Sequence, residues 1–117
     1  ATHHHKSKWM GEQAIMESVP KHTILRAGWL FGSLSDTGKD FVRDRANELS
    51  RLAAGETYLC NKDQIGNPTS VQFAARVITS VICNGYFGVY NCVNRGVVSR
   101  LAYVQKIIEI LNLDVRL

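Results

Sequence analysis

No apolar run in the 117 residues approaches the roughly 18–20 residues that a membrane-spanning helix needs. The sequence also has no basic and apolar N-terminal pattern of the kind that marks a secretory signal. We therefore expect no membrane association and a cytoplasmic location.

Cysteine is scarce, and Cys60, Cys83 and Cys92 form no Cys-x-x-Cys pair. An odd count without such a pair argues against a disulfide framework and against a structural zinc site. All three are therefore predicted to be buried small hydrophobic residues in a reducing compartment. The adjacent histidines 3–5 cannot all face one metal ion on regular structure, so we expect a purification remnant or an exposed terminus and no metal site.

Charge of one sign is not concentrated anywhere in the chain. The 14 basic and 10 acidic residues give a net charge of +4, and the basic residues are scattered rather than clustered. Nucleic-acid binders gather their basic residues on one face or in one run, so we expect no nucleic-acid partner. A mildly basic surface remains compatible with an anionic ligand such as a nucleotide.

What the sequence does contain is enough apolar residues, 45%, for one domain with a modest core. Hydrophobic periodicity and breaker residues predict an alternation of helices and strands. In order, the predicted elements are helix 7–18, strand 22–31, helix 39–54, strand 57–61, helix 69–83, strand 87–93, and a helix capped by Ser99 that ends near residue 111. This order predicts an α/β fold with parallel pairing, in which helices cover the three strands.

The strand predicted over 22–31 is nearly continuous in apolar residues, as in a strand covered on both faces. It carries two unusual residues. Arg26 requires either a structural ion pair or a ligand, and the residues alone do not decide between them. Trp29 stands just before a glycine loop, where it either stacks on a sugar or base or packs in the core.

The loop 63–69 packs a carboxylate, an amide, a hydroxyl and a proline between a predicted strand and a helix. Ligands of α/β sheets bind at the carboxyl ends of strands, which makes this loop a candidate site. A plain turn, with Pro68 fixing the backbone and Thr69 capping the helix, is the alternative. Tyr58 and Lys62 spell Tyr-x-x-x-Lys, but on a strand they stand roughly 13 Å apart, so we discount that motif.

Neither a GxGxxG turn nor a Walker A motif occurs in the chain. These are the turns that seat a nucleotide phosphate on a helix N-terminus. We therefore expect the isolated chain not to bind a nicotinamide dinucleotide appreciably.

Several segments, in the right order, resemble one known family. They are Lys8-Trp9-Met10-Gly11-Glu12, the run 23–32, the helix start 38–42, the loop 63–69, and the late segments 88–91 and 96–99. Over about residues 6–112 the chain resembles the C-terminal portion of the dTDP-4-dehydrorhamnose reductases, which are extended short-chain dehydrogenase/reductases. The resemblance implies that residues 1–117 form a single substrate-binding domain of a Rossmann-like enzyme, without its N-terminal cofactor-binding region.

The resemblance also implies roles for individual residues. Lys8 would be the lysine of the catalytic Tyr-x-x-x-Lys, while the tyrosine position holds His4. Substrate-binding roles fall to Trp29, Gln64, Pro68 and Thr69. The reaction implied is hydride transfer from NADPH or NADH to C4 of a dTDP-linked sugar, in the intact protein rather than in this chain alone.

Two other functions stay open. His4 in place of tyrosine fits a non-catalytic binding or regulatory subunit of the same fold. An epimerase or dehydratase of nucleotide sugars shares the fold but usually has a different loop in place of 63–69. If the resemblance to the reductases holds, we expect Trp29 to lie close to the loop 64–69. We also expect exposed apolar surface to favour a homodimer.

Overall fold

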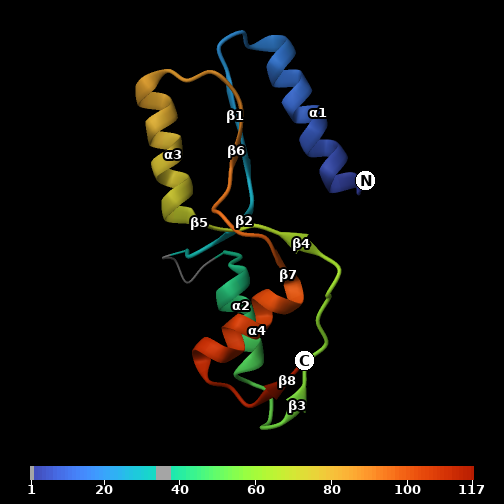
Figure 1. The fold of residues 1–117 in the computed structure, drawn as a ribbon. Helices are drawn as coiled ribbons and strands as arrows, with labels where there is room; N and C mark the ends of the chain where they lie inside the picture. The colour runs from blue at the N-terminus through green and yellow to red at the C-terminus, as the bar shows by residue number, and fades with distance from the viewer. Residues whose placement is uncertain (1, 34–37) are drawn as a thin grey trace.

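A computed structural model describes residues 2–33 and 38–117 of the chain. The loop predicted over 32–38 therefore lies outside the described residues for its central part, 34–37. The helices are α1 His3–Ser18, α2 Phe41–Leu49, α3 Val71–Asn84 and α4 Arg100–Leu111. The strands are β1 Thr23–Ala27, β2 Trp29–Phe31, β3 Glu56–Thr57, β4 Ile65–Gly66, β5 Pro68–Ser70, β6 Gly88–Cys92, β7 Val98–Ser99 and β8 Val115–Arg116 (Figure 1).

The strands of the described part pair two by two rather than forming one sheet. The pairs β1–β6, β2–β5 and β3–β8 are parallel, and β4–β7 is antiparallel. The α/β class and the mainly parallel pairing are thus confirmed. The expected set of three strands is wrong, because several pairs join short segments that carry no strand pattern of their own.

Gly28 divides the strand predicted over 22–31 into β1 and β2. A Cβ atom at this position would overlap the carbonyl oxygen of Asn67 and would lie 2.6 Å from Oγ1 of Thr69. The chain therefore passes the 67–69 segment at a distance that only glycine permits. Beyond Gly28 the strand changes partner, from β6 to β5.

The hydrophobic core lies where α2 and α4 pack together, in the lower half of Figure 1. Its buried members are Leu49, Val104 and Ile107, and the surrounding apolar side chains include Val42 and Ala46. These residues recur at helical spacing along α2 and α4, so the periodicity that predicted the two helices also marks the faces that they turn to the core.

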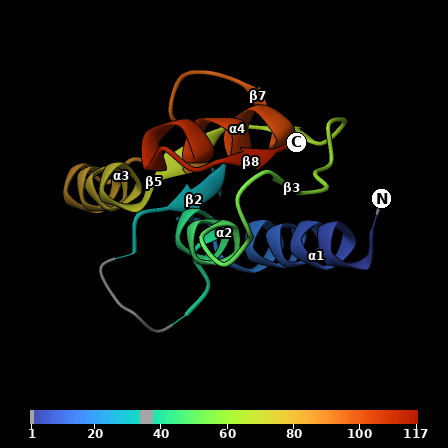
Figure 2. The same cartoon turned by 90° about the horizontal axis from the view of Figure 1, so that it is seen from below.

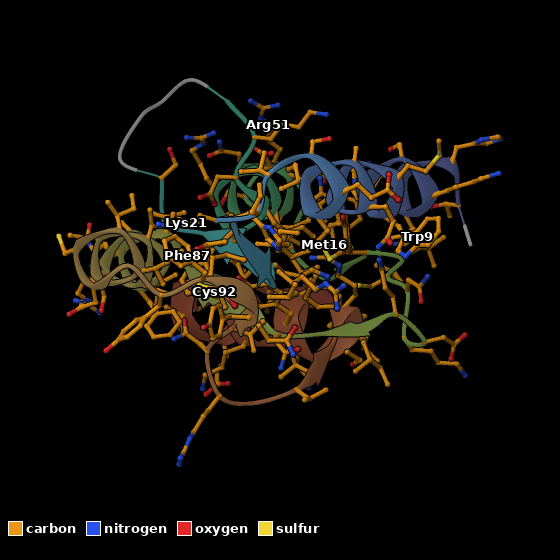
Figure 3. The ribbon with its side chains drawn as sticks, turned by 90° about the horizontal axis from the view of Figure 1, so that it is seen from above. Trp9, Met16, Lys21, Arg51, Phe87 and Cys92 are labelled. Atoms are coloured by element: carbon orange, nitrogen blue, oxygen red, sulfur yellow. The ribbon has the colours of Figure 1, made fainter. Side chains whose placement is uncertain are left out.

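The other half of the molecule is more open. There, β1 and β6 run between α1 and α3, and α1 buries no residue (Figure 1). Only Glu12, Gln13 and Met16 of α1 are even half-buried. Figure 3 labels Met16 and the exposed Trp9 on this helix. Val89 and Tyr90 of β6 are about two-fifths exposed, so the expectation that helices cover the strands on both faces is wrong for this pair.

The open half makes the molecule elongated, with extents of 56 × 31 × 27 Å (Figure 1). Figure 2 views it from below, along this long axis. Its radius of gyration is 17.4 Å, against about 13 Å for a compact chain of this length. No helix in the described ranges is long and apolar enough to cross a membrane.

The cysteines do not share one environment. Cys92, at the end of β6, is buried, Cys60 is half-buried and Cys83 is exposed near the end of α3. The expectation of burial is therefore wrong for Cys83, because the last turn of α3 carries it to the surface beside the exposed Ile82. All three thiols are free.

Candidate functional site

An open cleft of about 740 Å³ separates α1 from the junction of β1 and β2. Its walls come from four parts of the sequence: the face of α1, the end of β1 with the start of β2, the loop before β5, and Asn91 and Val93 at the end of β6. The lining residues that bear on function are His4, Lys8, Glu12, Trp29, Gly66 and Asn67. Two sequence-predicted residues, Lys8 and Trp29, thus border one cleft.

The face of α1 toward the cleft carries His4, Lys8 and Glu12 at intervals of four residues, so one turn of helix separates each from the next. Glu12 is occupied by Arg26, whose guanidinium lies 2.7 Å from its carboxylate. The hydrogen bond and charge of Arg26 lower the pKa of Glu12, and Glu12 in turn raises the pKa of Arg26. Arg26 therefore forms an ion pair, and it also lines the cleft.

Unlike Arg26, Lys8 has no ion-pair partner in the structure: among the ion pairs of residues 2–33 and 38–117, none involves its ammonium group. Its three N–H donors are therefore available to a ligand in the cleft.

Trp29 is held in place from several sides. Its backbone N–H donates to the carbonyl oxygen of Asn67 at 2.8 Å, and the residue is in register with Pro68 across β2–β5. A Cβ atom at Gly66 would overlap the indole, and the guanidinium carbon of Arg100 lies 3.6 Å from the ring centre. The expected proximity of Trp29 to the 64–69 loop is confirmed, with the indole half-buried at the cleft wall.

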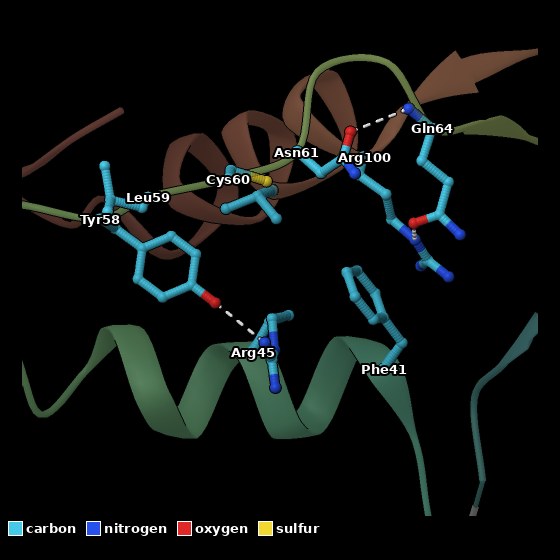
Figure 4. Close-up of a pocket in the computed structure, with 9 residues that line it drawn as sticks. Phe41, Arg45, Tyr58, Leu59, Cys60, Asn61, Gln64 and Arg100 are labelled. Atoms are coloured by element: carbon cyan, nitrogen blue, oxygen red, sulfur yellow. Dashed lines mark hydrogen bonds between the residues drawn. The ribbon is translucent and has the colours of Figure 1, made fainter.

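The loop residues do not all reach this cleft. Gln64 lines a separate, smaller pocket, where its amide oxygen accepts a hydrogen bond from Nε of Arg100 at 3.4 Å (Figure 4). Thr69 is fully buried, and its hydroxyl donates to the carbonyl of Asn67 at 3.0 Å and accepts from the N–H of Asn94 at 3.3 Å. Ser70, not Thr69, caps helix α3.

Tyr58 and Lys62 lie outside any helix, as expected when their Tyr-x-x-x-Lys string was discounted. The tyrosine hydroxyl accepts a hydrogen bond from Arg45 of α2 at 2.9 Å. No cluster of three or more metal-ligating side chains occurs in the described part of the chain.

Sequence reasoning overlooked an aromatic cluster behind Trp29. The Tyr103 ring stacks on Trp29 and on Phe41, with ring centres 6.3 Å and 5.1 Å away, and Arg100 lies between Trp29 and Phe41. Burial raises the pKa of Tyr103 to about 12. The only sequence signal was the position of Arg100 and Tyr103 in the first turn of a capped helix.

Sequence reasoning also overlooked the capping role of Asp40, because Asp40 was predicted to lie inside helix 39–54 rather than just before α2. Its carboxylate caps α2 by accepting from the N–H of Arg43 at 3.0 Å, and it also accepts from the N–H groups of Gly32 and Ser33 at 2.8 Å and 2.9 Å. Burial alone would raise its pKa, but these backbone donors lower it below the usual value. Asp40 therefore ties the end of β2 to the start of α2.

Comparison with known proteins places these features in a family. The family model described as the RmlD substrate binding domain matches residues 2–116. A dTDP-4-dehydrorhamnose reductase of Mycobacterium tuberculosis is 35% identical over 106 residues, which is 89% of this chain and 33% of that protein. A probable dTDP-4,6-dihydroxy-2-methyloxan-3-one 4-ketoreductase of Streptomyces antibioticus is 32% identical over 93% of this chain and 35% of its own length.

Solved structures are also similar to this chain, in both fold and sequence. The dTDP-4-dehydrorhamnose reductase of Bacillus anthracis in complex with NADP matches with a TM-score of 0.84 and 31% identity over 95% of this chain and 37% of that one. The corresponding protein of Clostridium acetobutylicum gives a TM-score of 0.80 at 30% identity, with the same coverage. The chain spans about a third of the length of the curated relatives it matches. By sequence and by fold, this chain belongs to the RmlD substrate-binding domain family.

Proposed function

We propose that this chain is the substrate-binding portion of an NADPH- or NADH-dependent reductase that acts on C4 of dTDP-4-dehydrorhamnose. The observation that carries the proposal is the meeting of Lys8 and Trp29 in one cleft, in a chain that belongs to the RmlD substrate-binding domain family. Each of these residues was singled out by its place in a motif, and they come from separate elements of the fold.

Trp29 would form the wall against which the sugar ring packs. An indole offers a large flat apolar surface for the apolar face of a sugar. The Asn67 hydrogen bond and the Arg100 contact fix the ring before a ligand arrives, so little ordering is required on binding.

We assign different roles to the residues of the loop before β5 and at its start. We assign Thr69 and Pro68 a positioning role, because the buried Thr69 hydroxyl is used within the protein and Pro68 pairs with Trp29 in β2–β5. Asn67 and Gly66, which line the cleft, are the loop residues placed to contact the sugar.

Lys8 and His4 supply the polar side of the cleft. The ammonium of Lys8 would donate hydrogen bonds to ribose hydroxyls of the cofactor. His4, one turn away, would donate a proton to the C4 oxygen, because a ring N–H of histidine is a common general acid.

The residues of this chain fit only one part of a nicotinamide cofactor. Lys8, without an ion-pair partner in the described residues, suits the ribose. The sequence has no glycine-rich turn for the diphosphate, so we place that contact in the rest of the protein. When bound, the cofactor supplies the hydride.

A second function is favoured by one specific residue. His4 stands where the resemblance places tyrosine, and a protein that lost this tyrosine could bind the nucleotide sugar without reducing it. Such a protein would serve as a binding or regulatory subunit. The cytoplasm is the location we propose in either case, consistent with three free thiols.

The test is the oxidation of NADPH by the intact protein with dTDP-4-dehydro-L-rhamnose. Lys8→Met is expected to lower kcat/KM by about a hundredfold or more, and Lys6→Met, two positions along α1 and outside the cleft lining, serves as the matched control. His4→Phe is expected to lower kcat, and His4→Tyr to retain or raise it. Binding of the nucleotide sugar without turnover in the wild type would favour the binding-subunit function, and absence of both would contradict the proposal.

A further inference from the structure

The two walls of the cleft are held in the fold to different degrees. The wall with Trp29 is built into the β2–β5 pairing, and its indole stacks on Tyr103 of α4. The other wall is α1, which carries His4 and Lys8, buries no residue and lies beside β1 (Figure 1). One wall is therefore fixed by packing, whereas the position of the other depends on a separate contact.

One pair of side chains makes that contact. Within residues 2–33 and 38–117, the hydrogen bonds and the ion pair between Glu12 and Arg26 are the only ones that join α1 to another helix or strand. Nε of Arg26 lies 3.1 Å from Oε1 of Glu12, and Nη2 lies 2.7 Å from Oε2. The guanidinium fork thus meets both carboxylate oxygens, which fixes the direction of the contact as well as its length.

The location of this pair distinguishes it from an ordinary surface ion pair. The side chain of Glu12 is only 20% exposed, although that of Arg26 is 51% exposed. Both residues line the cleft, Glu12 one helical turn from Lys8 and Arg26 three residues before Trp29. The pair therefore bridges the two walls beside the residues that the proposed function uses.

Helix geometry sets the size of the displacement that the pair would prevent. The helix joins β1 through residues 19–22, which lie about 22 Å along the helix axis from His4 at a rise of about 1.5 Å per residue. A rotation of α1 by about 10° around this connection would move His4 by about 4 Å. Because misplacement of a reacting group by about 1 Å can cost a hundredfold in rate, even a small rotation of α1 would disable the proton donor.

We propose that Arg26 is a positioning residue, whose ion pair with Glu12 holds the cleft-facing side of α1 at the working distance from Trp29. The inference deepens the proposed function and rests on it, because it takes His4 and Lys8 as the groups that act in the cleft. Arg26 itself transfers no proton. Its contribution to global stability is expected to be small, because one partner of the ion pair is half exposed.

The position of α1 is measured without any ligand, on the intact protein. Cys83, exposed near the end of α3, takes one nitroxide label, and Lys6→Cys, at an exposed position of α1 outside the cleft lining, takes the other. Cys60, Cys92 and any cysteine in the rest of the protein are replaced by alanine. Double electron–electron resonance then gives the distribution of distances between α1 and α3, the two helices that flank β1 and β6 (Figure 1).

A single narrow distribution is expected when Glu12 and Arg26 are both present. Arg26→Met should broaden the distribution or shift its centre, and should lower kcat for reduction of the nucleotide sugar by NADPH by about tenfold or more. KM for the nucleotide sugar should stay within about threefold of the wild type, because the wall with Trp29 is not displaced. Arg76→Met, which removes an exposed arginine of α3 outside the cleft lining, is the matched control and should change none of these quantities.

Exchange of the two charges separates positioning from direct contact with the ligand. In the double variant Glu12→Arg with Arg26→Glu, the ion pair is restored in reverse, while position 26 no longer carries a cation. We expect the double variant to regain a narrow distribution and a higher kcat than either single variant. Arg26→Lys, which keeps the charge but not the fork, should lie between the wild type and Arg26→Met.

Melting temperatures show whether each variant folds, and Glu12→Gln, which keeps the side-chain shape, gives a second test if Arg26→Met does not fold. The inference is overturned if loss of the pair leaves the distance distribution unchanged, or broadens it without lowering kcat. A double variant that regains the narrow distribution but keeps the low kcat of Arg26→Met would assign Arg26 to direct contact with the ligand, and would also overturn it. Absence of reductase activity in the wild type would contradict the proposed function, while the distance distributions would still show whether the pair holds α1.

Discussion

The backbone N–H of Trp29 donates a hydrogen bond to the carbonyl oxygen of Asn67, with 2.8 Å between the two atoms. This bond, continued by the β2–β5 pairing, joins two segments that are distant in the sequence. It sets the indole at the wall of the cleft opposite α1, and it brings the loop before β5 to the same place. The geometry of the candidate site depends on this contact.

Gly28 permits that contact, so Gly28→Ala is expected to lower the free energy of unfolding by about 1–3 kcal/mol, the usual range for overpacking. The added methyl group would overlap the Asn67 carbonyl and crowd the Thr69 hydroxyl. Thermal or urea unfolding measures the change. Gly11→Ala is the control: no atom lies within 4 Å of its added Cβ, and it should stabilise α1 or leave it unchanged. A Gly28→Ala protein as stable as the wild type would show that the two segments do not approach this closely.

Removal of the Tyr103 hydroxyl and removal of the Tyr58 hydroxyl are expected to change the free energy of unfolding differently. The Tyr103 hydroxyl is buried without a hydrogen-bond partner, so Tyr103→Phe should leave the protein equally stable or make it more stable. The Tyr58 hydroxyl accepts from Arg45 and donates to Glu48 at 3.3 Å, so Tyr58→Phe should cost about 1 kcal/mol. Chemical denaturation of both variants measures the difference. A larger loss from Tyr103→Phe than from Tyr58→Phe would contradict the hydrogen bonding described for this cluster.

The pKa of Asp40 is lower in the folded protein than its ordinary value. Its ionisation therefore stabilises the fold above its unfolded pKa of about 4, and this stabilisation is lost as the pH falls through the lower folded pKa. Asp40→Asn should cost about 1 kcal/mol near neutral pH, the order of a lost helix cap, and less as the pH falls below about 4.

The difference in unfolding free energy between the wild type and Asp40→Asn is measured by denaturation at pH values from neutral to acidic. Asp44→Asn, a partly exposed carboxylate on the same helix, is the matched control and should change stability by less than about 0.5 kcal/mol. A cost for Asp40→Asn that stays constant down to acidic pH would show that the charge of Asp40 is not what the three backbone donors stabilise.

Local sequence signals identified the four helices, although α1 begins at His3 rather than at residue 7 and α2 ends at Leu49 rather than at residue 54. Ser99 caps α4 as predicted, and α3 begins after Ser70, one residue beyond the Thr69 named in the sequence analysis. Gly85 ends α3 with a left-handed backbone. Apolar residues at helical spacing in α2, Leu49 among them, form part of the core. These features depend on neighbours along one helix, which a sequence displays directly.

Strands and side-chain partners were harder to predict, because both depend on distant segments. Ile65–Gly66 and Pro68–Ser70 have no alternating pattern, and they become strands only by pairing with β7 and β2. A strand was predicted over 57–61, but only Glu56–Thr57 forms one, by pairing with β8. The grouping of Arg100 with Trp29 and Phe41 follows from packing between three elements, which composition and spacing do not reveal.

The most direct test of the central claim, that Trp29 forms the sugar wall of the cleft, is a comparison of two ligands in Trp29→Ala of the intact protein. Steady-state kinetics give KM for dTDP-4-dehydro-L-rhamnose, and titration gives Kd for NADPH. Trp9→Ala, at an exposed tryptophan of α1 outside the cleft lining, is the matched control. We predict that Trp29→Ala raises KM for the nucleotide sugar by about tenfold, because the stacking surface is lost from the sugar side only, while Kd for NADPH stays within about twofold of wild type. Equal losses for both ligands, or an unchanged KM, would contradict the account.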